Sequence, residues 1–354
     1  MHGGFGEARE TSSASRSSPQ SAALIRTTEE LEAQVGARPA AIDLKVIDHL
    51  DVQARRWLAA SPLAFAGFSD ARRIDVTIGG GEPGFATALD EARLRLPAAA
   101  LDDPAQARPG GGAGLLFLVP GLGETLRVNG SVSAVDGDAI VIAVHECYAH
   151  CAKALLRSDF WRPATDAEPA DAAAFVRASR FMALATADAD LCTDVSPKGD
   201  PAGLLVQSVD AGIRFADRPG NRRTDSLRNL LVRPGAAALL VVPGCARVAL
   251  VQGEASIRAD PRLRQPFSVR DKMPKLVIDL ASPDIVLRES AALERARAWA
   301  GAAAPADIDP AAVFAAHVKL NKSGGLRAML ARRVISIPGL MRKGLDEDYK
   351  RNLY

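Results

Sequence analysis

The string LLFLVPG at Leu115–Gly121 returns as ALLVVPG at Ala238–Gly244, and this repetition decides the fold. The other matching pairs are Asp75 with Asp194, Gly130 with Gly253, and Trp161 with Trp299, which lie 119, 123 and 138 residues apart. Solenoid repeats have periods of about 20–50 residues, so this period is too long for one. It indicates a duplicated domain, and two copies of a domain commonly pack as a pseudo-symmetric dimer.

Short apolar runs separated by Gly, Pro and Asp dominate the chain, and they predict strands of antiparallel barrels or sandwiches. The runs are 63–68, 115–119, 139–144, 182–186, 204–209 and 237–242. Helices are fewer, and we expect them at 27–36, 43–60, 151–158, 224–232, 290–300 and 325–333. Thr27 and Glu30 have the spacing of a capping box at the start of the first. In the second, one helix face would be apolar and buried: Leu44, Ile47, Leu50, Ala54, Trp57 and Leu58. The predicted fold class is therefore mainly β with helices, an α+β protein built from two similar halves.

The predicted organisation has four parts. Residues 1–26 are rich in Ser, Gly and charge without periodicity, so we expect a disordered tail. The two repeated halves are residues 27–163 and 164–305, and a helical extension follows at 306–354.

Composition excludes several classes of protein. Hydrophobic residues are 48% and charged residues 24% of the 354, as in globular proteins. A net charge of +2 gives no reason to expect nucleic acid, and 5% aromatics argue against a stacking surface for single strands. No apolar run approaches about 18 residues, the length of a membrane-spanning helix. Four cysteines make no disulfide framework. We expect a soluble, reduced, cytoplasmic protein.

The strongest local signal is DRPGNRRTDSLRN at Asp217–Asn229. A Pro-Gly turn precedes Arg222 and Arg223, and Thr224 or Asp225 is suited to cap a helix beginning there. Unpaired N–H groups at a helix start, beside two guanidinium groups, favour a phosphate. A solvated basic turn is the alternative interpretation.

Two further residues belong to this candidate phosphate site. Ser196 and Lys198 lie in DVSPKGD at Asp194–Asp200, two positions apart and therefore on one face of a strand. Lys198 would add a third cation and Ser196 a hydroxyl.

A second signal is GLGETLRVNG at Gly121–Gly130, which predicts a hairpin turn entering a strand. Alternation places Thr125, Arg127 and Asn129 on the face opposite Leu126. A half-buried strand of this kind can present donors to a ligand. An edge strand with one solvated face is the alternative.

The third signal is HECYAHCAKALLRSDFW at 145–161. Four potential soft ligands fall within it: His145, Cys147, His150 and Cys151. Their spacing fits no usual zinc pattern, so we predict no metal site and expect buried thiols at a strand end. Zinc binding by the cluster, and haem ligation by His145 or His150, are the alternatives.

Together these motifs resemble the pyridoxamine 5′-phosphate oxidase-related family of FMN-binding split β-barrels, over about residues 27 to 305. In that family one chain usually carries every motif, and FMN lies between two identical barrels. In this chain the second half carries DVSPKGDPAG (194–203) and DRPGNRRTDSLRN, whereas the first carries PGLGETLRVNG (120–130) and HCAKALLRSDFW (150–161). The resemblance implies two tandem split β-barrels packed as a pseudo-dimer.

The counterparts of these motifs have decayed in a complementary way. The first half has DVTIGGGEPGF at 75–85, without the lysine, and a different loop at 97–114. The second half has PGCARVALVQG at 243–253 and ESAALERARAW at 289–299. Because motifs from both partners meet around each flavin in this family, the chain can build one complete site and one dead site. We expect one flavin per chain, between the halves.

The resemblance also implies which residues bind FMN. The phosphate would be held by Ser196, Lys198, Asn221, Arg222 and Arg223. Thr125 and Arg127 would approach the ring from the other half, and Lys153, Arg157 and Trp161 would close the site.

The implied function is an FMN-dependent oxidoreductase that transfers hydride through flavin N5 to or from an unknown small substrate. An electron donor or acceptor would be its other partner, and no catalytic protein residue is assigned because no nucleophile is needed. The alternative is a non-catalytic storage or sensor protein that binds flavin, haem or F420. Since the pseudo-dimer is internal, the chain needs no second copy and can be a monomer.

Overall fold

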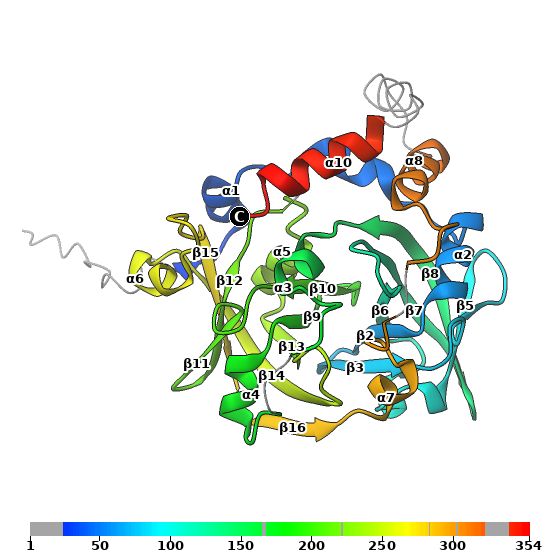
Figure 1. Cartoon of the computed structure of the whole chain (residues 1–354), viewed down its shortest axis with the longest axis horizontal. Helices are drawn as coiled ribbons and strands as arrows, with labels where there is room; N and C mark the ends of the chain where they lie inside the picture. Colours follow the sequence, from blue (N-terminus) through cyan, green and yellow to red (C-terminus); the bar gives the residue numbers. More distant parts are fainter. Residues whose placement is uncertain (1–23, 165–167, 221, 283, 302–303, 323–339) are drawn as a thin grey trace, which may run out of the picture.

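The computed structural model describes residues 24–164, 168–220, 222–282, 284–301, 304–322 and 340–354. Within this part the strands form two separate antiparallel sheets, one from each half of the chain (Figure 1). The predicted α+β class with two tandem barrels is confirmed.

The first half forms a seven-stranded sheet in the order β3-β2-β6-β7-β8-β5-β4. Its strands are β2 (Leu63–Ser69), β3 (Ile74–Gly80), β4 (Thr87–Ala88), β5 (Arg93–Pro97), β6 (Gly112–Leu118), β7 (Thr125–Asp136) and β8 (Ala139–His150). Its helices are η1 (Ala40–Lys45), α2 (Val52–Ala60), η2 (Ala98–Ala100), η3 (Pro104–Gln106) and α3 (Lys153–Ser158).

The second half repeats the path strand for strand, as β10-β9-β13-β14-β15-β12-β11, with β1 and β16 added to β14. Its strands are β9 (Phe181–Ala187), β10 (Thr193–Gly199), β11 (Val206–Val209), β12 (Gly212–Asp217), β13 (Gly235–Val241), β14 (Arg247–Arg258), β15 (Leu276–Ala281) and β16 (Ile285–Glu289). Its helices are α4 (Ala172–Ala178), α5 (Asp225–Val232), α6 (Pro261–Arg264), η4 (Gln265–Phe267) and α7 (Ala291–Ala296). The added strand β1 (Leu24–Ile25) and the helix α1 (Thr28–Val35) come from the N-terminal end of the chain and pack on this half. Helices α8 (Pro310–Leu320) and α10 (Leu340–Arg351) follow. No helix in the described ranges is long and apolar enough to cross a membrane.

The apolar strands are buried on both faces because each barrel has an inner core and an outer face against the other barrel. On β6, Leu115 and Phe117 point into the core of the first half. Leu116 and Leu118 belong instead to the cluster between the halves, which also contains Phe181 of β9. Continuous apolar runs are what a strand between two cores requires.

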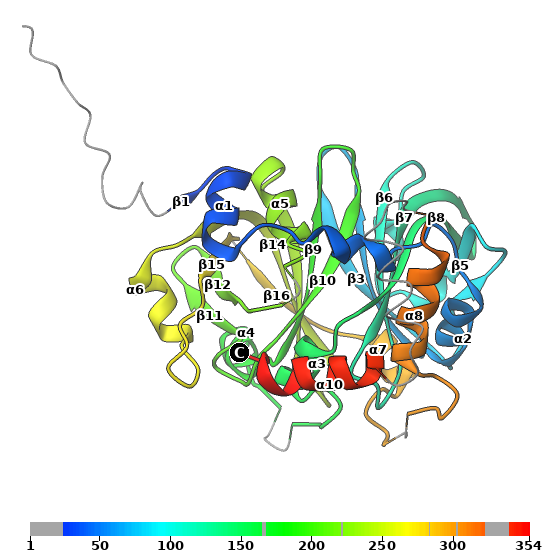
Figure 2. The same cartoon turned by 90° about the horizontal axis from the view of Figure 1, so that it is seen from above.

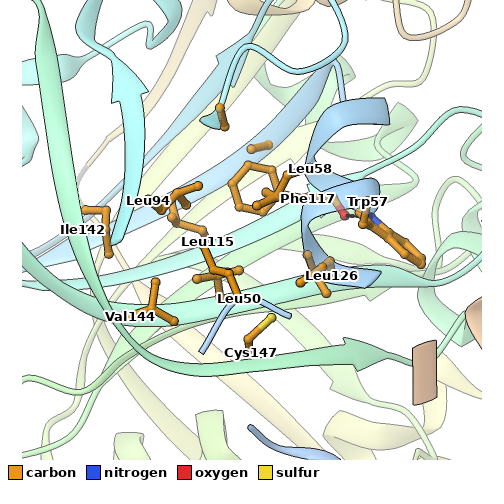
Figure 3. Close-up of a cluster of buried hydrophobic side chains, with 14 of the residues drawn as sticks. Leu50, Trp57, Leu58, Leu94, Leu115, Phe117, Leu126, Ile142, Val144 and Cys147 are labelled. Carbon is orange, nitrogen blue, oxygen red and sulfur yellow. Dashed lines mark hydrogen bonds between the residues drawn. The ribbon is translucent and has the colours of Figure 1, made fainter. Parts of the chain in front are cut away.

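Figure 3 shows how the core of the first half is closed from one side. Leu50, Trp57 and Leu58 pack over the inward side chains of the sheet, among them Leu115 and Phe117. The indole of Trp57 donates to the Phe117 carbonyl oxygen over 3.4 Å, so the only polar atom of this side chain is satisfied in the core.

The single helix predicted at 43–60 is wrong, although the buried face predicted for it is right. The chain forms η1, then an extended stretch where Ile47 bridges to Cys147, and only then α2. Asp51 begins α2, because its carboxylate accepts from the Ala54 N–H over 2.8 Å. Leu50 and Trp57 are still fully buried.

The start of the described chain packs on the second half. Most of the predicted tail at 1–26 lies outside the described residues, but Leu24–Ile25 form β1 against β14, so these two residues are a strand and not part of a tail. The predicted capping box of Thr27 and Glu30 opens α1, and Leu31 enters the core of the second half. The helix predicted at 325–333 also lies outside the described residues.

Equivalent contacts relate the two halves. The Asn129 amide donates to Asp194 Oδ1 over 2.9 Å, and its repeat partner Gln252 donates to Asp75 Oδ1 over 3.1 Å. The Arg157 guanidinium likewise donates to a backbone carbonyl of the opposite half, and so does that of Arg295, the residue with the same spacing in the second repeat. The repeat read from the sequence is therefore a pseudo-symmetry of contacts.

Two glycines test this symmetry. A Cβ at Gly199 would lie 1.9 Å from the Ala154 carbonyl oxygen, and a Cβ at Gly80 would lie 1.9 Å from that of Ala292. We expect Gly199→Ala and Gly80→Ala each to lower the free energy of unfolding by about 1–3 kcal/mol or more, because backbone must move. Gly235→Ala is the control, since its Cβ would lie 4.0 Å from the nearest atom. Denaturant unfolding of the three variants measures this, and equal stability for all three would contradict the packing described.

Candidate functional site

A cavity of about 580 Å³ lies between the halves, lined by β7 and α3 of the first half and by β10 and residues 217–220 and 222–227 of the second. Helix α3 packs on one part of β10, and α5 also contacts this strand. Among the described lining residues, nine lysines and arginines face three aspartates. The electrostatic character of the wall therefore favours an anion.

Arg127 on β7 reaches from one half to the other. It is 1% exposed, and its guanidinium donates to the Tyr148 hydroxyl over 2.8 Å, to Asp194 Oδ1 over 3.0 Å and to the Ser196 hydroxyl over 3.3 Å. Burial raises the pKa of Asp194, and the charge of Arg127 opposes that rise. Leu126 on the same strand points into the core, as the alternation predicted.

Ser196 and Lys198 on β10 both line the cavity, in keeping with the predicted shared strand face. Lys198 Nζ is 3.8 Å from Asp217 Oδ1, too long for a strong ion pair. Burial lowers the pKa of Lys198. Its ammonium group is thus placed to gain from an incoming anion.

The two arginines of the loop have different surroundings. Arg222 is exposed at the cavity wall, in a left-handed backbone conformation with φ 58°. Arg223 is buried and faces Asp225, Asp43 at 3.3 Å and Glu146 at 3.7 Å. Arg223 lines the cavity but belongs to a charge network between the halves. Thr224 begins α5 without the predicted side-chain cap, because it too is left-handed with φ 56°.

The remaining predicted residues divide into three groups. Lys153 and Arg157 of α3 line the cavity. Thr125 is buried and Trp161 donates its indole N–H to the Leu122 carbonyl oxygen over 2.5 Å, and neither is part of the lining. Asn221 lies outside the described residues.

Sequence reasoning missed several residues on the cavity wall. They are Asp200, Arg218, Lys272 and Tyr354, together with Cys151 and His150, which had been weighed only as metal or haem ligands. Asp200 and Arg218 belong to the motifs DVSPKGD and DRPGNRRTDSLRN, so the motifs already pointed to these two residues as candidates for the cavity wall. Lys272 and Tyr354 lie in segments to which the sequence assigned no role at the site, and the fold brings them here.

His150 is a neutral imidazole on the cavity wall. Burial lowers its pKa well below the ordinary value, and the charges of Arg127 and Lys45 lower it further. Its Nδ1 is buried without a hydrogen-bond partner in the described structure. A neutral ring of this kind can accept a proton, donate a hydrogen bond or ligate iron.

The site predicted to be dead is filled by protein. By the repeat, Lys198 corresponds to Gly79 and Arg127 to Leu250. Leu101 packs against Gly79. The Asp102 carboxylate accepts from the Ser290 hydroxyl over 2.5 Å and from the Ala292 N–H over 2.8 Å. The Asp102 carboxylate of the loop at 97–114 therefore occupies the N-terminus of α7.

The structure separates two of the four potential zinc ligands at 145–151. Cys147 points into the core of the first half (Figure 3), whereas His145 is exposed. Within the described ranges no three His, Cys, Asp or Glu side chains gather as a metal site would require.

Comparison with known proteins supports the sequence resemblance. The family model described as pyridoxamine 5′-phosphate oxidase matches residues 169–304, and for this part of the chain the predicted family is confirmed. No curated protein matches the chain.

Solved structures match about a third of the chain. HupZ of Group A Streptococcus is 16% identical, covering 31% of this chain and 86% of its own with a TM-score of 0.26. General Stress Protein 26 of Bacillus anthracis is 18% identical, with 32% and 87% covered and a TM-score of 0.25. An F420 reductase is 17% identical, with 32% and 93% covered and a TM-score of 0.25.

Lys45, beneath this site, makes stability depend on pH. It is 5% exposed, its ammonium donates to the Ala149 carbonyl oxygen over 2.7 Å, and burial lowers its pKa from 10.5 to about 8. The unfolded chain binds the proton more tightly, so this residue makes the free energy of unfolding rise with pH between about 8 and 10.5, by on the order of 3 kcal/mol.

Denaturant unfolding at several pH values checks this expectation against Lys45→Met. Between about pH 8 and 10.5 the free energy of unfolding of the wild-type chain should rise relative to that of Lys45→Met, and below pH 8 the difference between the two proteins should stay constant. Parallel curves for the two proteins would contradict the assignment to Lys45.

Proposed function

We propose that this chain is an FMN-dependent oxidoreductase that holds one FMN between its halves. One observation carries the proposal: cations from both halves converge on one cavity, whereas the repeat counterparts of Lys198 and Arg127 are the uncharged Gly79 and Leu250. A binding protein with two equivalent sites would have kept both sets.

The residues of the cavity fit such a cofactor. A volume of about 580 Å³ is in the range of small-molecule sites, roughly 300–1,000 Å³. Buried donors without partners lie on its wall, namely Arg127 Nε and Arg218 Nη2. Unpaired donors beside cationic side chains suit a ligand that carries a phosphate and a polar ring system.

The residues then take separate roles. Lys198, Ser196 and Arg222 would hold the phosphate, and Arg127 would fix the relative position of the halves beside it. Lys153 and Arg157 would bound the opposite side of the cavity. When bound, FMN supplies two-electron hydride transfer at N5, while the chain binds, orients and excludes water.

A second candidate, a non-catalytic haem protein, is favoured by one feature. His150 offers a neutral imidazole with an unpartnered Nδ1, and Cys151 is adjacent on the same wall. Both are potential axial ligands.

The absorption spectrum of the purified protein, with the cofactor released by heat and counted per chain, separates these functions. We expect a flavin spectrum and about one FMN per chain. Two per chain would contradict the filled second site, and a Soret band would support haem. A colourless protein that cannot be reconstituted with FMN would overturn the proposal.

Variants test which residues hold the phosphate. Lys198→Met with Arg222→Ala removes two cations, and a hydrogen bond to a charged group is worth about 1.5–3 kcal/mol. We expect FMN to bind at least about tenfold more weakly, measured by fluorescence titration of the reconstituted protein.

Arg295→Ala is the matched control, because Arg295 stands at the filled site and donates to the carbonyl oxygens of Gly80 and Ala100. It should keep wild-type FMN affinity. An equal loss in both proteins would show that the effect comes from the fold and not from the phosphate site.

A further inference from the structure

The last residues of the chain run into the wall of the cavity. Helix α10 packs on α8 beside the first half and ends beside the second half (Figures 1 and 2). Tyr354, which follows it, lines the same cavity as the predicted FMN-binding residues. We call residues 348–354 the strap.

Residues of both halves hold the strap. Lys153 Nζ is 2.8 Å from Asp348 Oδ2, and Arg157 Nε donates to the Leu353 carbonyl oxygen over 2.6 Å. From the second half, Lys272 donates to the Tyr354 carbonyl oxygen over 2.9 Å. Two cations predicted to close the cofactor site are therefore engaged by the chain itself.

The aromatic ring of Tyr354 lies close to two guanidinium groups. Its centroid is 5.5 Å from Arg157 Cζ and 5.6 Å from Arg218 Cζ, within the distance of cation–π attraction. Burial and then the neighbouring Asp200 charge raise the pKa of the Tyr354 phenol. The ring is thus placed with its hydroxyl group near Asp200.

Two buried polar atoms on this wall have no hydrogen-bond partner of normal geometry. Arg218 donates to Asp200 Oδ2 over 2.7 Å and to the Phe267 carbonyl oxygen over 2.7 Å, but its Nη2 donates to nothing in the described structure. Asp200 Oδ1 has no donor of normal hydrogen-bond geometry, and the Tyr354 hydroxyl approaches this carboxylate closely enough to lower its pKa. The two side chains are only 6% and 3% exposed, so water does not readily replace the missing bonds.

A single hydroxyl group can form a hydrogen bond with Arg218 Nη2 and with Asp200 Oδ1 at the same time. Its oxygen can accept from Arg218 Nη2 while its proton is donated to Asp200 Oδ1. An aromatic ring carrying that hydroxyl would stack on the guanidinium groups of Arg157 and Arg218 as Tyr354 does. Ring and hydroxyl together define a chemical class, the phenols.

We propose that Arg157, Arg218 and Asp200 form a subsite for a hydroxylated aromatic ring, and that Tyr354 occupies it as a competitor within the molecule. A ligand of this class must displace the strap, so its apparent affinity is reduced by the fraction of molecules in which Tyr354 is bound. If the proposed flavin function holds, this subsite names the substrate class as phenolic. The binding itself does not depend on flavin.

The probe is 4-methylphenol, the side chain of tyrosine as a free molecule, titrated calorimetrically into the full chain. We expect Tyr354→Ala to bind it at least about tenfold more tightly than the wild-type chain, because the competitor is gone. Tyr354→Phe keeps the ring but loses the hydroxyl beside Asp200, so its affinity for 4-methylphenol should lie between those of the wild-type chain and Tyr354→Ala. Tyr354 is at the cavity wall and not in a hydrophobic core, so both variants should fold.

Two controls define the subsite. Toluene lacks the hydroxyl and should gain little from Tyr354→Ala. Adding Arg218→Lys to Tyr354→Ala keeps a cation beside Asp200 but removes the planar fork, and it should reverse the gain in 4-methylphenol affinity.

Unchanged 4-methylphenol affinity in Tyr354→Ala would overturn the proposal, as would an equal gain for toluene. The FMN content of every sample is measured in parallel. If the protein is colourless and Tyr354→Ala still binds 4-methylphenol more tightly, the flavin function is refuted and the subsite is supported. If the protein carries FMN but Tyr354→Ala gains no affinity, the subsite is refuted and the flavin function is supported.

Discussion

The buried guanidinium of Arg127 joins the two halves, because it donates to Asp194 and Ser196 of the second half from a strand of the first. A cation taken out of water is tolerated only where an anion and hydrogen-bond acceptors meet it. The Asp194 carboxylate forms the ion pair with Arg127, and it also accepts hydrogen bonds from the side-chain amides of Asn129 and Asn229. This set fixes β7 against β10, and the cavity lies beside that contact.

The filled position shows the same contact without its charge. Gln252 still reaches Asp75, but Leu250 stands where Arg127 would be, and Leu250 packs with the cluster between the halves. The loop at 97–114 then packs Leu101 against Gly79 and Asp102 against the start of α7, at the position that the repeat relates to the cavity. A duplicated barrel can lose one site in this way because the pseudo-dimer interface is kept by apolar packing, in which Phe65 meets Phe181.

Much of the fold was predictable because it depends on local patterns. The apolar runs predicted strands, the capping box of Thr27 and Glu30 predicted a helix start, and the alternation along β7 assigned Arg127 and Leu126 to opposite faces. The helix predicted at 43–60 failed where Ile47 pairs with Cys147, a partner 100 positions away that no local periodicity contains. The structure does not place Trp161 in the cavity lining, because its indole N–H donates to the Leu122 carbonyl oxygen instead.

The sequence by itself determined that the domain is duplicated and that the motifs are divided between the halves, since both properties follow from repeat spacing. That the cationic residues meet between the halves was implied by the family resemblance of these motifs. Only the tertiary structure decided that Arg223 is tied to Asp225 and Asp43, and that Tyr354 lies close to Arg157 and Arg218. The physical reason is that an ion pair or a ring contact depends on which side chains arrive at one point in space. That arrival is set by the packing of distant elements, whereas a motif records only the neighbours along the chain.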